Sequence, residues 1–329
     1  MPSTYERELQ VGIAAIRQAA TLCRAVQAGI APDALAKKDK SPVTVADFGS
    51  QAIVCRALHE AFDNDPVIAE EDSSELTTAE NAQVLNQVVE HVRRAQPEAS
   101  PESVCEWIDR GRTREFCNRF WTLDPIDGTK GFLRKEQYAV SLALIVGGRI
   151  EVAILGCPNL PAKSVCGDGS GAIFFAIHGH GAFAQPLDDQ SPSVAIRVSA
   201  QRVPALARFC ESVESGHSSH NDAAAIAERL GITNEPLRMD SQAKYAVVAR
   251  GEAEIYLRMP TRADYREKIW DHAGGVLVVT EAGGTVTDIA GKPLEFTHGP
   301  ELVANRGVIV TNGHLHDRVV AAVQAVSFQ

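Results

Sequence analysis

The hydrophobic pattern predicts two amphipathic helices at the start of the chain. Over residues 5–29, apolar side chains recur every three or four positions, which places them on one face of a helix. These positions are Leu9, Ile13, Ile16, Ala20 and Cys23. After a polar, lysine-rich segment, Pro42 introduces a second helix, because proline suits the first helical turn. Its inner face is expected to carry Val45, Phe48, Ala52, Cys55 and Phe62.

Short apolar runs separated by turn residues then predict a sheet. Residues 66–69 are expected to form a short buried strand, residues 77–94 an amphipathic helix, and residues 95–119 a polar surface segment. Gly, Pro and Asn divide the next runs into four expected strands, at 138–146, 150–155, 172–177 and 181–185. We expect an antiparallel sheet that the first two helices cover.

The pattern changes near residue 200, where strand-like and helix-like runs begin to alternate as in an α/β unit. Helices are predicted at 220–230 and 271–282, the second ended by Gly283-Gly284. At 329 residues the chain exceeds the size at which one core usually stops growing. We therefore predict an α+β metal-binding domain over residues 1–200 and an α/β domain over residues 201–329.

Composition restricts the classes of function. The 42 acidic and 32 basic residues give a formal net charge of −10, which opposes binding to nucleic acids or anionic membranes. No apolar run reaches membrane-spanning length and the N-terminus lacks a basic, then apolar, leader, so a soluble cytoplasmic protein is expected. The seven cysteines include no Cys-x-x-Cys pair, which is typical of a reducing compartment. Cys105 and Cys117 could form a redox pair, but two ordinary thiols are the better interpretation.

The segment Trp121–Thr129 carries the most chemical information. It places Asp124 and Asp127 three residues apart, followed by Gly128, which can adopt positive φ, and by a hydroxyl. An apolar run that enters such a turn suits a strand ending in a tight loop, so both carboxylates should project from one corner. Carboxylates this close repel each other unless a cation lies between them, and a hard divalent cation is the usual solution. The motif therefore predicts a metal site.

Three further acids lie at the ends of predicted elements. Asp47 falls in the first turn of the second helix, Glu70 follows a strand, and Asp271 begins a helix. Each has a purely structural interpretation: Thr44-x-x-Asp47 resembles a capping box, Asp271 suits an N-cap, and Glu70 could be a solvated loop acid. Their occurrence together with Asp-Pro-Ile-Asp-Gly-Thr favours a shared site.

Four segments also resemble the signature blocks of a known superfamily, and they occur in order over residues 40–290. They are Ser41–Asp47, Ile68–Asp72, Leu123–Thr129 and Trp270–Gly275. The chain resembles the lithium-sensitive, magnesium-dependent phosphatases. These include inositol monophosphatases, inositol polyphosphate 1-phosphatases, fructose bisphosphatases and 3′(2′),5′-bisphosphate nucleotidases. The resemblance implies a layered αβαβα sandwich and hydrolysis of a phosphate monoester.

The resemblance further implies which residues bind Mg²⁺. Glu70, Asp124 and the backbone carbonyl of Ile126 would bind one ion. Asp124, Asp127 and Asp271 would bind a second, and a third, weaker ion near Glu70 would be held mostly by water. Inhibition by Li⁺, and by Na⁺, is implied as well. Carboxylate and carbonyl oxygens suit Mg²⁺, and paired ions can stabilise both the attacking and the leaving oxygen.

The same resemblance implies that Asp47 and Thr129 orient and deprotonate the attacking water. A bound water loses pKa units to a metal ion, so Asp47 need not be a strong base. The backbone amides after Gly128 would start a short helix that offers an anion site to the phosphate.

Substrate choice should come from three blocks of the second domain: Val213–His220, Met239–Tyr245 and Ile255–Pro260. Lys244 and Arg258 supply positive charge for a second substrate phosphate. Structural interpretations compete here, since Lys244 could be a solvated helix residue and the histidines capping groups. The blocks resemble the fungal and plant 3′(2′),5′-bisphosphate nucleotidases more closely than the inositol enzymes.

This closer resemblance implies hydrolysis of 3′-phosphoadenosine 5′-phosphate to AMP and phosphate, and activity on 3′-phosphoadenosine 5′-phosphosulfate. Substrate contacts are implied for Thr129, His217, Ser241, Lys244, Arg258 and Asp271. Tyr245 is, by position alone, a candidate adenine platform. Two alternatives remain: an inositol polyphosphate 1-phosphatase or inositol monophosphatase with the same metal ligands, and a non-catalytic nucleotide or metal sensor. We expect a small-molecule nucleotide as partner, no nucleic acid, no membrane, and a monomer.

Overall fold

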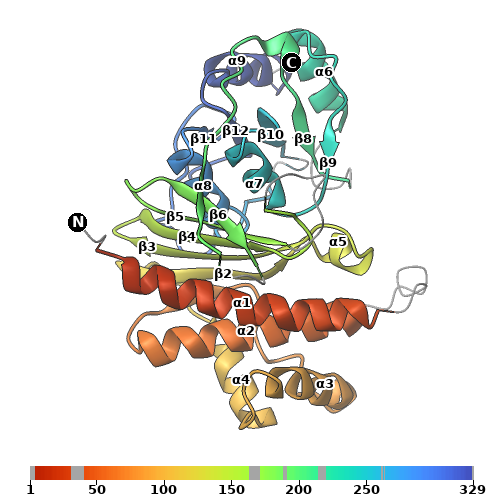
Figure 1. The fold of residues 1–329 in the computed structure, drawn as a ribbon, viewed down its shortest axis with the longest axis vertical. Helices are drawn as coiled ribbons and strands as arrows, with labels where there is room; N and C mark the ends of the chain where they lie inside the picture. Colours follow the sequence, from red (N-terminus) through yellow and green to blue (C-terminus); the bar gives the residue numbers. More distant parts are fainter. Residues whose placement is uncertain are drawn as a thin grey trace.

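Five alternating layers of helix and sheet stack along the long axis of the molecule (Figure 1). The computed structural model describes residues 4–30, 41–162, 171–187, 191–213, 220–260, 262 and 264–327. Two helices form the first layer, a seven-stranded sheet the second, two helices the third, a five-stranded sheet the fourth, and two helices the fifth. The predicted αβαβα sandwich is confirmed.

The first layer contains helices α1 (Glu6–Ala28) and α2 (Ser41–Ala61), which pack side by side against the larger sheet (Figure 1). The predicted apolar stripes are buried, with Ile16 and Ala52 fully inaccessible, except that Phe62 follows the end of α2 and is only partly buried. Beyond α2 lie the 3₁₀ turn η1 (Ala79–Asn81) and helix α3 (Ala82–Arg93). Both predicted helices are confirmed, and α3 confirms most of the third.

A helix not predicted from the sequence, α4 (Pro101–Asp109), lies in the segment expected to be a polar surface excursion. Ser100 caps it by accepting a hydrogen bond from the backbone N–H of Ser103, and Pro101 occupies its first turn. Val104 and Ile108 are buried, so the helix packs against α2. The prediction was wrong because this capping signal outweighs the polarity of the segment.

The seven-stranded sheet follows chain order, and its first pair is parallel while the others are antiparallel. Its strands are β1 (Val67–Ala69), β2 (Arg119–Asp127), β3 (Ala139–Val146), β4 (Arg149–Cys157), β5 (Ala172–Ile177), β6 (Ala182–Pro186) and β7 (Val194–Ile196). The predicted strands and the cover of α1 and α2 are confirmed. A short helix, α5 (Thr129–Leu133), follows β2 directly.

A β-bulge in β2 aims both acids of the opening motif at the same face of the sheet. Asp124 pairs with Ser141 and Asp127 with Ala139, so three steps along β2 match only two along β3. Without the extra residue, side chains three positions apart would point to opposite faces. Ser141 lies on the face turned toward the second half of the chain, where it contacts Gln242.

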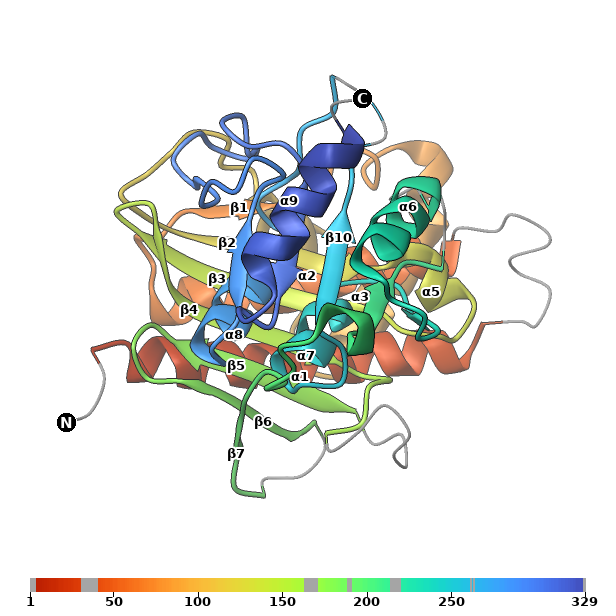
Figure 2. The same ribbon diagram turned by 90° about the horizontal axis from the view of Figure 1, so that it is seen from above.

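The second sheet has the strand order β11-β12-β10-β8-β9. The strands are β8 (Phe209–Glu211), β9 (Leu237–Arg238), β10 (Ile255–Arg258), β11 (Thr285–Thr287) and β12 (Val308–Thr311), and a 3₁₀ turn, η2 (Pro204–Leu206), precedes β8. Helices α6 (His220–Leu230) and α9 (His316–Ser327) pack together on its outer side (Figure 2). The change of sheet falls between residues 196 and 209, and a domain boundary near residue 200 stays a prediction.

Helices α7 (Ala243–Ala249) and α8 (Ala273–Glu281) fill the layer between the sheets. Two glycines let α8 approach its neighbours closely. A Cβ on Gly275 would lie 2.2 Å from the ring of Tyr245, and one on Gly274 would lie 2.5 Å from Ser141 Oγ. This close packing brings the start of α8, and with it Asp271, to the end of β2.

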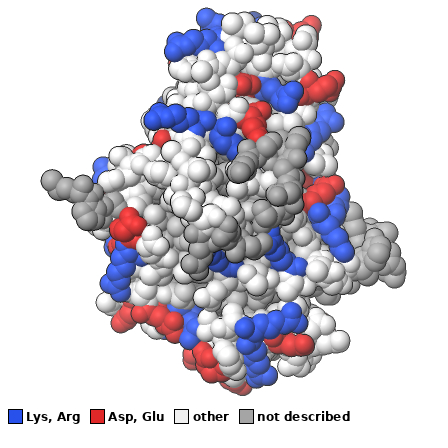
Figure 3. Space-filling view, viewed as in Figure 1, with Lys and Arg blue, Asp and Glu red and all other residues white. Residues whose placement is uncertain are grey.

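The described surface mixes charges of both signs. On the face shown in Figure 3, Lys and Arg side chains are interspersed with Asp and Glu side chains. Within the described ranges, no helix combines the length and the apolar character needed to cross a membrane.

Candidate active site

A cavity of about 620 Å³ opens where the ends of β1 and β2 meet α5, α7, β10 and the start of α8. It brings together residues that are far apart in the sequence, and nearly all the predicted site residues line it. These are Glu70, Asp124, Ile126, Asp127, Thr129, Ser241, Lys244, Arg258 and Asp271.

The acidic corner of the cavity is assembled by strand pairing. Because β1 runs parallel to β2, with Ala69 opposite Leu123, Glu70 emerges beside Asp124. Burial and neighbouring carboxylates raise the pKa of Glu70 to about 8. They raise the pKa of Asp271 to about 6, although Arg258 opposes that shift. The pKa of Asp124 is also raised, by burial and then by the Glu70 carboxylate.

This donor set fits a hard divalent cation. Asp124 is only 2% exposed, and its Oδ1 has no hydrogen-bond partner within the described part of the chain. A buried oxygen without a partner is costly, and several buried carboxylates raise that cost because they repel each other. A cation bound by carboxylate oxygens and the Ile126 carbonyl would relieve both penalties, and oxygen ligands of this kind are those that Mg²⁺ prefers.

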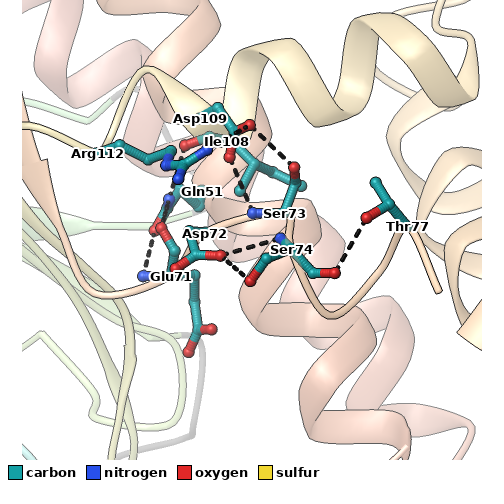
Figure 4. A network of polar contacts seen from close by, with 9 residues as sticks. All are labelled: Gln51, Glu71, Asp72, Ser73, Ser74, Thr77, Ile108, Asp109 and Arg112. Atoms are coloured by element: carbon teal, nitrogen blue, oxygen red, sulfur yellow. Dashed lines mark hydrogen bonds and ion pairs between the residues drawn. The ribbon is translucent and has the colours of Figure 1, made fainter.

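A network of hydrogen bonds fixes the backbone next to Glu70 (Figure 4). The side chain of Gln51, fully buried in α2, donates to the carbonyl oxygen of Glu71 at 2.6 Å and accepts from its N–H at 3.1 Å. Asp109 accepts from the N–H of Ser73 at 2.9 Å and from its hydroxyl at 3.0 Å. The loop that presents Glu70 is therefore tied to α2 and α4.

Asp47 is buried near the carboxylates of Glu71 and Glu70 and does not line the cavity. Since α2 begins at Ser41, Asp47 falls in its second turn and not in the first as predicted, and the capping-box interpretation with Thr44 is wrong. Burial, then the carboxylates of Glu71 and Glu70, raises the pKa of Asp47. Its position beside the acidic loop agrees with a role near the cation.

Asp271 precedes α8 in a turn, and the N-cap position belongs to His272, so the N-cap interpretation of Asp271 is wrong. Its carboxylate lies 3.7 Å from Arg258 Nη2, and Arg258 Nε lies 3.1 Å from Glu267 Oε2. His272 Nε2 also contacts Glu267 Oε2, at 3.1 Å. Arg258 is thus held at the boundary between the acidic corner and the rest of the cavity.

Lys244 provides a second positive charge, and it is 3% exposed, which excludes the interpretation of a solvated helix residue. Its Nζ lies 5.1 Å from the centre of the Tyr256 ring. Burial lowers the pKa of Lys244, while the Asp127 carboxylate opposes that shift. A buried ammonium at a cavity wall is suited to meet an anionic group of a ligand.

Tyr245 cannot be the adenine platform. It is fully buried, and its hydroxyl forms a 2.7 Å hydrogen bond with Nδ1 of His272. The aromatic residues that do line the cavity are Tyr256, Tyr265 and Trp270. Tyr256 and Trp270 lie in blocks that the sequence singled out, although neither was assigned to the cavity, and Tyr265 lies outside those blocks.

Other lining residues were also missed by the sequence analysis. They are Lys130, Leu133, Ser212, Asp240 and Lys268. Lys130 directly follows the motif at Thr129 and could have been found from it, whereas Ser212 and Lys268 reach the cavity through the tertiary fold. His217 lies outside the described residues, as does the side chain of His220, so their roles stay predictions.

Comparisons with known proteins show what the chain is similar to. Residues 5–327 match the inositol monophosphatase family. The chain is 45% identical to a 3′(2′),5′-bisphosphate nucleotidase from Schizosaccharomyces pombe, over 98% of this chain and 97% of that protein. It is 42% identical to one from Emericella nidulans, over 98% and 99%. An inositol monophosphatase structure from Anabaena has the same fold, with a TM-score of 0.64, 20% identity and 98% of each chain covered.

Proposed function

Because the chain belongs to the inositol monophosphatase family, we propose that it is a Mg²⁺-dependent phosphatase acting on bisphosphate nucleotides. The reaction is hydrolysis of the 3′-phosphate of 3′-phosphoadenosine 5′-phosphate, which yields AMP and phosphate. The observation that carries this proposal is the division of one cavity into an acidic corner and a cationic wall. An ester with two phosphates matches that division, since one can meet a metal cluster and the other Lys244 and Arg258.

Glu70, Asp124 and the Ile126 carbonyl would bind one Mg²⁺, and Asp124, Asp127 and Asp271 a second, with a third, weaker ion near Glu70. When bound, Mg²⁺ activates a coordinated water and offsets negative charge on the phosphate. Members of this family are generally Mg²⁺-dependent and Li⁺-sensitive. We therefore propose inhibition by Li⁺, and by Na⁺, in this chain as well.

Asp47 and Thr129 would orient and deprotonate the attacking water. The Thr129 hydroxyl lines the cavity at the start of α5 and can orient that water toward phosphorus. The pair would remove its proton while the new P–O bond forms and the bond to the ribose 3′-oxygen breaks, and the 3′-oxygen would then take up a proton. Burial, and then the neighbouring carboxylates, raise the pKa of Asp47, so positive charge nearby is needed to keep it ionised and able to accept a proton.

The nucleotide left after hydrolysis would be held by Ser241, Lys244 and Arg258, together with His217. Lys244 offers one charged donor and Arg258 a planar, multidentate one, and both suit phosphate oxygens. A 5′-phosphosulfate presents similar anionic oxygens, so 3′-phosphoadenosine 5′-phosphosulfate is a second substrate under this proposal.

Product analysis tests the proposal. The protein is incubated with 3′-phosphoadenosine 5′-phosphate and Mg²⁺, and the nucleotide product is identified by chromatography. We expect adenosine 5′-monophosphate with one equivalent of phosphate. Adenosine 3′-monophosphate as the product would reverse the assigned orientation. Tight binding of AMP without any phosphate release would favour a nucleotide sensor.

A further inference from the structure

Gln242 joins parts of the candidate site that come from the two halves of the chain. It is 1% exposed. Its backbone N–H donates to Asp127 Oδ2 at 2.6 Å, and its side-chain Nε2 donates to the carbonyl oxygen of Trp270 at 2.9 Å. Trp270 immediately precedes Asp271. Gln242 therefore contacts the Asp127 carboxylate directly, and it also contacts the backbone next to Asp271.

The other half of the Gln242 amide is bound as well. Its Oε1 accepts from Ser141 Oγ in β3 at 3.0 Å and from the N–H of Gly275 in the first turn of α8 at 3.2 Å. The N–H of Gly275 can only donate, and the carbonyl of Trp270 can only accept, so these two partners determine the orientation of the amide. The Gln242 side chain therefore connects the start of α7 to α8 and to the larger sheet through hydrogen bonds.

The backbone before Gln242 needs such an anchor. Ser241 has φ +71°, in the left-handed region that residues other than glycine seldom adopt. Across from it, Gly128 has φ +91°, and a Cβ there would lie 2.9 Å from Ser241 Cβ. This conformation turns the N–H of Gln242 toward Asp127, and surrounding contacts must maintain it. The three hydrogen bonds of the Gln242 side chain provide those contacts.

We propose that Gln242 is a positioning residue that sets the separation and orientation of Asp127 and Asp271 for the cation they share. This inference rests on the proposed function only in assigning both carboxylates to one cation. Residues that position metal ligands through hydrogen bonds commonly affect how tightly the metal binds. Their removal typically weakens metal binding about 10- to 100-fold.

Binding of Mn²⁺, used as a spectroscopic probe for Mg²⁺, tests the proposal on the full-length protein. Gln242→Met retains the side-chain volume and removes all three side-chain hydrogen bonds. We expect its Mn²⁺ affinity, measured by electron paramagnetic resonance, to fall at least about tenfold. We also expect kcat at saturating nucleotide to fall more than KM changes, because the nucleotide contacts remain.

A matched control separates positioning from general stability. Asn312 is fully buried, and its side chain also makes three hydrogen bonds, to Ser199, Gln201 and Leu315, but it does not line the cavity. Asn312→Leu should lower the melting temperature and leave Mn²⁺ affinity unchanged. If Gln242→Met does not fold, Gln242→Asn decides the question, since it retains the amide but is one methylene too short to reach both Trp270 and Gly275.

Wild-type Mn²⁺ affinity in the folded Gln242 variants would overturn the positioning role, whatever their melting temperatures. Failure of the proposed function has a different signature. Wild-type protein that binds Mn²⁺, loses affinity in the variants and yet releases no phosphate from the nucleotide would support the positioning role and contradict the phosphatase. Phosphate release from the nucleotide, together with normal Mn²⁺ binding in the variants, would support the phosphatase and contradict the positioning role.

Discussion

Replacing Lys244 by methionine removes one positive charge from the cavity wall while retaining the length of the side chain. In the proposed complex, Lys244 meets the phosphate that is not hydrolysed. A hydrogen bond to a charged group contributes about 1.5–3 kcal/mol, which is about 10- to 150-fold in kcat/KM. Because Lys244 is 3% exposed, bulk water cannot easily replace the lost contact, so we expect the upper part of that range.

The assay compares kcat/KM for 3′-phosphoadenosine 5′-phosphate with kcat/KM for adenosine 3′-monophosphate, which lacks the second phosphate. For the variant, kcat/KM should fall about 10- to 150-fold on 3′-phosphoadenosine 5′-phosphate. Most of the activity on adenosine 3′-monophosphate should be retained. Its melting temperature should not fall, because removing a buried ammonium relieves a desolvation cost. Lys292→Met, at an exposed position, is the control. Equal losses on both substrates would show that Lys244 does not contact the second phosphate.

Three further predictions concern the acidic corner and the layer behind it. Asp124→Asn should abolish turnover and weaken Mn²⁺ binding while the fold is retained, as checked by circular dichroism; normal kcat would show that Asp124 binds no essential ion. The raised folded-state pKa values of Glu70 and Asp271, about 8 and 6, mean that the metal-free protein loses stability as pH rises from about 5 to 8. The rise in melting temperature caused by Mg²⁺ should therefore be larger at pH 8 than at pH 5.5, and an equal rise at both values would contradict this. Gly275→Ala should destabilise the fold by about 1–3 kcal/mol in urea unfolding, because its Cβ meets the Tyr245 ring, and wild-type stability would show that α8 can move away.

The sequence was most informative where local chemistry determines structure. Apolar spacing correctly predicted α1 and α2, and Gly, Pro and Asn correctly divided the strands of the larger sheet. Repulsion between Asp124 and Asp127 predicted a cation site, and the structure places those acids beside Glu70 and Asp271 in one cavity.

Features that depend on tertiary packing were not predictable in this way. The bulge in β2 follows from its pairing with β3, which no local pattern encodes. Tyr245 and Tyr256 both lie in apolar segments and both are buried, but only Tyr256 lines the cavity, whereas the Tyr245 ring packs against Gly275 of α8. Helix α4 was missed although its capping signal at Ser100 and Pro101 is local, because its two buried residues, Val104 and Ile108, give only a weak periodic signal.

Rates of phosphate release from 3′-phosphoadenosine 5′-phosphate and from inositol 1,4-bisphosphate, in Mg²⁺ with and without millimolar Li⁺, decide whether the protein is a nucleotidase. We expect a much higher kcat/KM for the nucleotide and inhibition by Li⁺. A higher kcat/KM for the inositol substrate, or no release from the nucleotide, would contradict the proposed function.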